Sequence, residues 1–261
     1  MTLPSVWKNF PRPLLSGVPM PSLPKKENMM SNPVITRLDI DWIKQNVELD
    51  SPEALVLFDI DSTIMNTAPR NYAILEEAAR EFEFLRGITG EVNLEHMGWN
   101  ICDDVKSVRN LSKEQIDCLY DFWEKRFFFD PWIGYDIPYE GVRELLHWLH
   151  QQCRIVYLTG RDSEYMEDGT ISSFIEHKLP NDEKTTFLFK PSKDIPDLSF
   201  KQEAFEYIRK LGRVVLAIEN EPANANAMHK AFPDAVIGLI QTITAPNPAA
   251  PHKEIFLFET Y

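Results

Sequence analysis

Short apolar segments alternate with amphipathic segments along residues 54–240, and this alternation constrains the fold more than any other feature of the chain. The apolar segments predict buried strands at residues 54–60, 154–158, 185–189, 213–218 and 235–240. The amphipathic segments predict helices at residues 139–152, 164–178, 200–211 and 223–232. Strands and helices that alternate in this way indicate an α/β fold, in which a parallel sheet has helices on both faces. Ligands of such sheets bind at the carboxyl ends of the strands, so the residues after each strand are the candidates for a functional site.

Residues 66–136 interrupt the alternation directly after the first strand. They contain two helical patterns, at 72–85 and 113–127, which predict a helical cap over the end of that strand. Apolar residues at helical spacing predict one further helix at residues 35–47. We therefore divide the chain into three parts. Residues 1–34 are a proline-rich arm, residues 66–136 are the helical cap, and residues 35–65 together with 137–261 form the core.

The arm contains seven of the 19 prolines, which predicts an irregular segment because proline fixes φ and has no N–H to donate. It has no apolar stretch typical of a signal peptide. Docking of the arm on a second copy of the chain is one hypothesis for its role, so a homodimer is one candidate for the oligomeric state, which stays open.

The chain is acidic, with 27 Lys and Arg against 40 Asp and Glu and a formal net charge of −13 at pH 7. Binding to long nucleic acids or to anionic membranes requires a basic face, so this balance disfavours both partners. No apolar run is long enough for a transmembrane helix. A small phosphorylated substrate is still compatible, because an active site can be locally positive within an acidic protein.

The cysteines and histidines predict neither disulfides nor a zinc site. The cysteines are odd in number, widely spaced and set in apolar surroundings, which favours buried structural roles in a reducing compartment (Cys102, Cys118 and Cys153). No spacing among the histidines of the core helices suggests zinc ligands (His147, His150 and His229). We therefore expect a cytoplasmic protein.

Two carboxylates follow the first strand. Asp59 and Asp61 are two residues apart, so their side chains project to the same side. One could attack phosphorus while the other transfers the proton of the leaving group. The preceding apolar residues and the following Ser62 and Thr63 favour a catalytic role for the pair.

The next two strands end in groups suited to phosphate. After the second strand, the Thr159 hydroxyl, the backbone N–H groups around Gly160 and the Arg161 guanidinium could bind phosphoryl oxygens. Lys190 follows the third strand, and Lys201 opens the next helix. Either lysine could neutralise phosphate charge and hold the nucleophile. The fourth strand is followed by oxygen ligands of the kind that Mg²⁺ prefers, from Glu219, Asn220 and Glu221.

The order of these motifs resembles the haloacid dehalogenase superfamily, whose members are mostly Mg²⁺-dependent phosphatases with a Rossmann-like core. Phe-Asp-Ile-Asp-Ser-Thr at 58–63 is similar to its first motif and Leu-Thr-Gly-Arg at 158–161 to its second. The resemblance implies that Asp59 is the nucleophile, which forms an aspartyl-phosphate. It also implies that Asp61 is the general acid/base and a main-chain ligand of Mg²⁺, and that Thr159 binds the transferring phosphoryl group. Asp61 belongs to the phosphatase form of the motif, which disfavours dehalogenation.

Two lysines are candidates for the third motif. Lys201 has the usual spacing before Asn220, whereas Lys190-Pro191 has the Lys-Pro form of many members. In polynucleotide 3′-phosphatases of the superfamily, a basic residue after the strand and a lysine on the next helix both serve as third-motif residues. Their Ser-Gly-Arg is also similar to the Thr-Gly-Arg that ends at Arg161. We therefore expect both lysines to bind phosphate, with Lys201 as the motif residue.

The fourth motif departs from the family. The family usually has an acidic pair there, or Gly-Asp followed by a later Asp. This chain has Glu219-Asn220 at the pair and Asn224 at the position of the later Asp. Asparagine ligates Mg²⁺ without charge, so the charge would come from Glu219 or Glu221. The leading hypothesis is phosphomonoester hydrolysis of a small substrate, and a mutase or phosphotransferase would use the same residues. A nucleotide or nucleic-acid-end phosphatase and a non-catalytic binding protein of this fold are the alternatives.

Overall fold

The computed structural model describes residues 31–261, so the predicted arm lies almost wholly outside the described residues. A seven-stranded sheet has the order β1-β9-β8-β7-β2-β5-β6, and every neighbouring pair in it is parallel. This confirms the predicted α/β fold with a Rossmann-like parallel sheet. The strands are β1 (Val34–Arg37), β2 (Ala54–Phe58), β5 (Arg154–Asp162), β6 (Thr185–Lys190), β7 (Arg213–Glu219), β8 (Val236–Ile240) and β9 (Phe256–Thr260).

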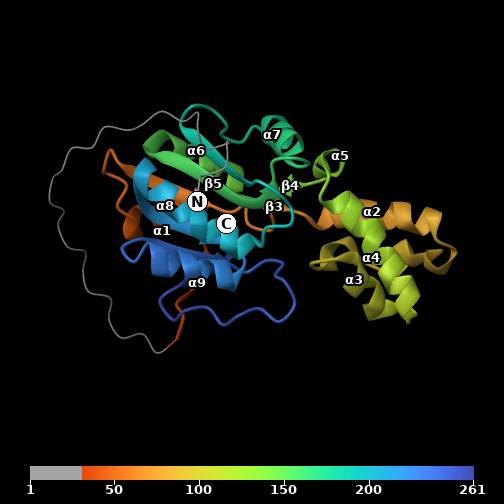
Figure 1. The fold of residues 1–261 in the computed structure, drawn as a ribbon. Coiled ribbons are helices and arrows are strands. Elements are labelled where there is room, and N and C mark those ends of the chain that lie inside the picture. The colour runs from red at the N-terminus through yellow and green to blue at the C-terminus, as the bar shows by residue number, and fades with distance from the viewer. Residues whose placement is uncertain (1–30) are drawn as a thin grey trace.

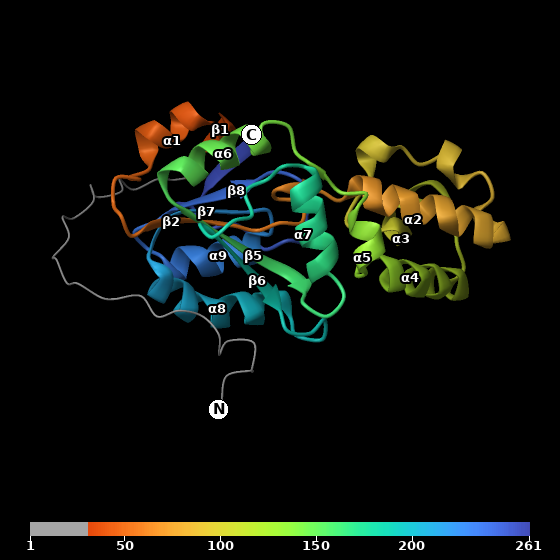
Figure 2. The same cartoon turned by 90° about the horizontal axis from the view of Figure 1, so that it is seen from above.

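Helices cover both faces of the sheet, as Figure 2 shows from above. One face packs against α1 (Ile40–Asn46), α6 (Val142–Gln152) and α7 (Glu167–Glu176). The other face packs against α8 (Asp197–Leu211) and α9 (Pro222–Ala231). The strands at the centre of the sheet are apolar on both sides because both of their faces are buried.

Strand β2 is central, with β5 on one side and β7 on the other. Its last residue, Phe58, is in register with Tyr157 and Ile218. The chain continues from β2 to β5 and β6 on one side, then returns to β7 and β8 on the other. This reversal of strand order opens a crevice beside the end of β2, the usual ligand position in such sheets.

The cap lies beyond the carboxyl end of β2, at the right of Figure 1. Strands β3 (Met65–Asn66) and β4 (Ile137–Pro138) form an antiparallel pair where the chain leaves and re-enters the core. The cap has its own apolar core, in which Trp123 is buried and donates a hydrogen bond from Nε1 to Asn71 at 2.7 Å. Its helices are α2 (Ala68–Glu81), α3 (Ile101–Val108), α4 (Lys113–Phe127) and α5 (Asp130–Ile133), with 3₁₀ turns at Glu83–Leu85, Ile88–Gly90 and Leu94–His96.

The prediction of a helix throughout residues 35–47 is wrong for its first part. Residues of β1 pair with β9, and α1 begins after Asp39, whose carboxylate accepts a hydrogen bond from the N–H of Trp42 at 2.8 Å. Pairing of β1 with the end of the chain overrides a local helical pattern. Strand β9 is formed by apolar residues near the C-terminus and lies between β8 and β1.

The expectation of buried cysteines is wrong for Cys118, which is exposed on α4, whereas Cys102 is buried and Cys153 is half-buried. All three thiols are free. Within residues 31–261, no helix is both long and apolar enough to cross a membrane.

Gly238 in β8 allows close packing between neighbouring strands. A Cβ at this position would lie 2.6 Å from both Ile218 and Phe258. We expect Gly238→Ala to lower the free energy of unfolding by about 1–3 kcal/mol through overpacking. Gly134→Ala is the matched control, because a Cβ there meets open space, and its effect should stay within about 0.5 kcal/mol. Equal effects in denaturant unfolding would contradict this account.

Candidate active site

A pocket of about 390 Å³ lies between the carboxyl ends of the strands and the cap. The predicted site residues that line it are Asp59, Asp61, Gly160, Arg161, Lys190, Lys201, Glu219, Asn220 and Glu221. Thr159 is the exception, since it is buried behind the pocket and its hydroxyl accepts a hydrogen bond from the N–H of Arg161 at 3.2 Å. The parallel sheet therefore brings together groups that are up to 162 residues apart.

A tight turn after β2 positions the two carboxylates. The N–H groups of Ile64 and Met65 both donate to the carbonyl of Ile60, and Ser62 has a left-handed backbone with φ of 55°. Such a conformation is rare for a residue other than glycine and is often found at functional sites. The turn leaves Asp59 buried, whereas the Asp61 side chain is 31% exposed.

Lys201 lies between two buried carboxylates. Its Nζ donates to Asp59 Oδ1 at 2.6 Å and to Glu219 Oε2 at 2.7 Å. Burial, with the charge of Glu219 added, raises the pKa of Asp59 to about 7 although Lys201 opposes the shift. Burial would lower the pKa of Lys201, but the two carboxylates outweigh it and raise that pKa above its usual range. The ammonium therefore stays charged and orients Asp59.

A second charged network connects Asp61 to the cap. Arg161 donates to both oxygens of Asp61 at 2.8 and 2.9 Å, and Arg70 of α2 donates to Oδ1 at 2.6 Å. Both arginines also donate to Oδ2 of the buried Asp136 at 2.6 Å. Burial would raise the pKa of Asp61, but the two arginines outweigh it and hold that pKa well below its usual range. In this arrangement Asp61 is ionised.

Lys190 and Gly160 meet Asp197, at the start of α8. Lys190 Nζ donates to Asp197 Oδ1 at 2.6 Å and to the carbonyl of Lys193 at 3.3 Å. A Cβ at Gly160 would lie 2.2 Å from Asp197 Oδ2, so glycine allows this carboxylate to approach the backbone closely. Both lysines line the pocket, but they have different partners. Lys201 pairs with Asp59, and Lys190 pairs with Asp197.

The oxygens near Asp59 fit a hard divalent cation. The single hydroxyl of Thr63 lies 3.0 Å from Asp59 Oδ2 and 3.1 Å from Asn220 Oδ1, so its one hydrogen cannot serve both acceptors at once. Asn220 is oriented by its Nδ2, which donates to the carbonyl of Ile243 at 2.6 Å. Carboxylate and amide oxygens that converge in this way suit Mg²⁺.

The two predicted glutamate ligands are already engaged. Glu219 uses Oε2 for Lys201, and its Oε1 accepts the N–H groups of Asn220 and Glu221 at 3.1 Å each. Oε1 of Glu221 accepts the N–H of Ala245 at 2.6 Å, and burial raises the pKa of Glu221. Asp59 and Asn220 are therefore the side chains best placed to hold the cation.

Sequence reasoning assigned no roles to Asp136, Asp197 or Thr63, and it did not single out Arg70. Arg70 and Asp136 are completely buried, and their pairing with each other, with Arg161 and with Asp61 offsets the cost of this burial, which raises the pKa of Asp136. The sequence holds a signal for Thr63, since it directly follows the Asp-x-Asp pair. No local pattern marks the others.

Comparison with protein-family models matches residues 56–180 to the haloacid dehalogenase-like hydrolases. This match covers the first two motifs and the cap, and it agrees with the resemblance that the motifs predict. No curated protein sequence matches the chain significantly.

Among solved structures, the chain is similar to a Clostridium difficile protein whose assignment as a phosphatase is provisional. The identity is 14%, the TM-score is 0.52, and the match covers 79% of this chain and 94% of that one. A haloacid dehalogenase-like family hydrolase from Streptococcus pneumoniae matches with 12% identity and a TM-score of 0.48, over 79% and 93% of the two chains. At these identities the first match supports the fold.

We expect Lys201→Met to lower the free energy of unfolding by about 3 kcal/mol, because it leaves two buried carboxylates without their cation. Adding Glu219→Gln should recover part of this loss, since one of the two charges is then removed. Lys190→Met is the control, because its partner Asp197 is about half exposed, and it should cost less than about 1 kcal/mol. Denaturant unfolding measures all three, and a Lys201→Met loss no larger than that of Lys190→Met would refute the cluster's role.

Proposed function

We propose that this chain is a Mg²⁺-dependent phosphomonoester hydrolase that forms an aspartyl-phosphate on Asp59. The observation that carries the proposal is the carboxylate of Asp59 at the floor of the pocket, held by Lys201 and Thr63. The match of residues 56–180 to the haloacid dehalogenase-like hydrolases supports hydrolysis, and the Asp61 carboxylate favours a phosphatase.

In the first step, Asp59 attacks phosphorus and the ester P–O bond breaks, so that the phosphoryl group is transferred to the carboxylate. In the second step, water attacks the phosphorus of the aspartyl-phosphate, and inorganic phosphate leaves. Lys201 remains beside Asp59 throughout and offsets charge on the phosphoryl oxygens. When bound at Asp59, Asn220 and the Asp61 carbonyl, Mg²⁺ would supply further positive charge there and favour the ionised nucleophile.

Asp61 would donate a proton to the leaving alcohol and then accept one from the attacking water. In the substrate-free structure Arg161 and Arg70 hold Asp61 ionised, so proton donation requires these contacts to weaken. Guanidinium groups form strong bidentate contacts with phosphate oxygens, so a bound phosphoryl group would compete with Asp61 for them. Once these contacts weaken, the pKa of Asp61 rises and the carboxylate takes up from solvent the proton that it donates. Asp136 would keep both arginines in place during this exchange, because each already donates to it.

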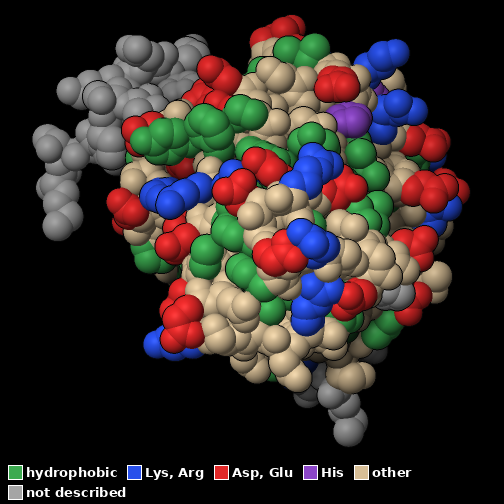
Figure 3. Space-filling model, turned by 90° about the vertical axis from the view of Figure 1, so that its right-hand side faces the viewer, with side chains coloured by type: hydrophobic (Ala, Val, Ile, Leu, Met, Phe, Trp, Pro, Cys, Tyr) green, Lys and Arg blue, Asp and Glu red, His purple; other side chains and the backbone are tan. Residues whose placement is uncertain are grey.

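The substrate we propose is a small phosphorylated molecule. The cap helices close one side of the pocket, whose volume of about 390 Å³ is in the range of small-molecule sites. Figure 3 shows acidic and basic side chains interspersed on the outer face of the cap, which gives long nucleic acids no continuous basic surface there. A cytoplasmic location is part of the same proposal.

We expect the chain to hydrolyse para-nitrophenyl phosphate with Mg²⁺, and EDTA to abolish this turnover. Asp59→Asn should reduce kcat by at least about 10³-fold, because the amide is not a nucleophile, while thermal unfolding shows an intact fold. Asp194→Asn, at another carboxylate that lines the pocket, is the matched control and should remain active. Full activity of Asp59→Asn would refute the nucleophile assignment, and absence of turnover in the wild type together with absence of Mg²⁺ binding would favour a non-catalytic binding protein.

A nucleotide phosphatase is the second candidate, favoured by the aromatic wall of the pocket. Trp99 and Tyr120 line it and are 41% and 42% exposed, beside Trp123, Phe127 and Phe128. Flat aromatic side chains at the mouth of a phosphate site can stack on a nucleobase. Arg161 within Thr-Gly-Arg is a second feature in favour of this reading.

Under this second candidate, Trp99→Ala should lower kcat/KM for a nucleoside 5′-monophosphate about tenfold, the loss of one stacking contact. The same variant should leave kcat/KM for ribose 5-phosphate nearly unchanged, because that substrate has no base. Tyr135→Ala is the matched control, since Tyr135 is an exposed aromatic residue that does not line the pocket. Equal losses on both substrates would contradict base recognition.

A further inference from the structure

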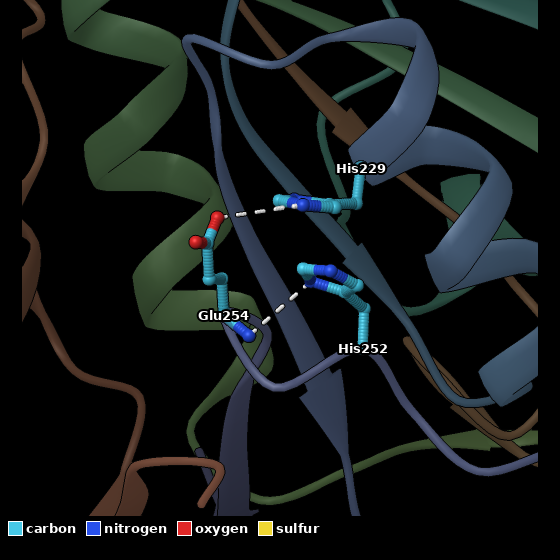
Figure 4. A group of neighbouring side chains, drawn as sticks. All are labelled: His229, His252 and Glu254. Atoms are coloured by element: carbon cyan, nitrogen blue, oxygen red, sulfur yellow. Dashed lines mark hydrogen bonds and ion pairs between the residues drawn. The ribbon is translucent and has the colours of Figure 1, made fainter. Parts of the chain in front are cut away.

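Two histidines and a glutamate converge at the far end of α9 from the pocket. His229 lies in the last turn of α9, whereas His252 and Glu254 lie in the loop that leads into β9. Figure 4 shows the three side chains pointing toward one another from the helix and the loop. One potential ligand atom from each residue lies within 4.8 Å of the other two.

One of the three pairs already has nearly the spacing of a metal centre. His229 Nε2 lies 3.5 Å from Glu254 Oε2. Ligand atoms about 2.0–2.1 Å from a tetrahedral Zn²⁺ are separated by roughly 3.3 Å, so this pair already has nearly the required spacing. The His252 ring stacks on His229 with 4.3 Å between centroids and 24° between planes. The side chain of His252 is exposed, so it has room to turn its nitrogen from this stacked position toward the other two ligands when a metal binds.

The backbone that carries His252 is fixed on α9. The N–H of His252 donates to Asn226 Oδ1 at 2.6 Å, and Asn226 Nδ2 donates to the carbonyl of Ala250 at 2.9 Å. Asn32 Nδ2 donates to the carbonyl of His252 at 2.8 Å. Asn226 and His229 are three residues apart on the helix and therefore share one face. The loop thus presents its ligands to His229 at a defined position.

We propose that His229, His252 and Glu254 form a binding site for Zn²⁺ or a similar first-row divalent ion. Two imidazole nitrogens and one carboxylate oxygen suit this class of metal, whereas Mg²⁺ and Ca²⁺ prefer oxygen ligands throughout. Because His252 is exposed, water would occupy the fourth position. The ion would bind the C-terminal end of α9 to the loop before β9 and act as a structural link. The proposal differs from the expectation from sequence, in which the spacing of His229 from the other core-helix histidines did not suggest zinc ligands.

The first test is a calorimetric titration of the metal-stripped full chain with ZnCl₂. Excess Mg²⁺ and a phosphine reductant are present throughout, so that the proposed catalytic site is occupied and the thiols stay reduced. We expect one equivalent of Zn²⁺ to bind and to raise Tm. His252→Ala should weaken this binding more than about tenfold while the fold is kept, because its side chain is exposed and its backbone contacts remain. Failure of the wild type to bind, or unchanged binding by His252→Ala, would overturn the proposal.

His150→Ala is the matched control. His150 Nε2 pairs with Asp182 Oδ1 at 2.8 Å, but among the described residues no third metal-ligating side chain completes that pair. This variant should bind Zn²⁺ as the wild type does, and loss of binding in it would count against the assigned site. Substitution with Co²⁺ distinguishes the ligands, because a nitrogen and oxygen set gives no thiolate charge-transfer band. Such a band would assign the metal to cysteines instead. None of these readouts depends on phosphatase activity.

Discussion

The buried ammonium of Lys201 is the interaction on which the rest of the site depends. It joins the ends of two neighbouring strands and one helix, because its partners Asp59 and Glu219 follow β2 and end β7, while Lys201 lies on α8. Two carboxylates at adjacent strand ends would repel each other strongly in an apolar interior. With the ammonium between them, the sheet can present Asp59 to the pocket in one fixed orientation.

A second group of charged side chains connects the core with the cap. Arg161 comes from the core and Arg70 from the cap, and Asp61 and Asp136 lie between them. Each of the four groups pairs with two of the others, so removal of one takes away half of the ion pairs of two neighbours, and the network holds the cap at a defined position over the pocket. In the proposed reaction the same arginines would exchange a carboxylate for a phosphoryl group, which would link substrate binding to the release of Asp61.

The parts of this molecule that could be predicted from sequence follow from local patterns and from one rule of topology. Apolar runs indicate the central strands, and parallel pairing then places Asp59 beside Glu219. The contacts of Arg70 with Asp136 could not be predicted, because they join residues 66 apart through the packing of the cap. The pairing of β1 could not be predicted either, because its partner strand β9 lies at the other end of the chain. The local pattern at β1 predicts a helix instead.

The central claim is that Asp59 becomes covalently phosphorylated during turnover. Its most direct test is to mix the enzyme with substrate and Mg²⁺, quench with acid within milliseconds, and locate the added phosphoryl group by mass spectrometry. We predict a single phosphoryl group on Asp59 that hydroxylamine removes, as expected for an acyl phosphate. A turnover-competent enzyme that carries no phosphoryl group under these conditions, or carries it on another residue, would contradict the account.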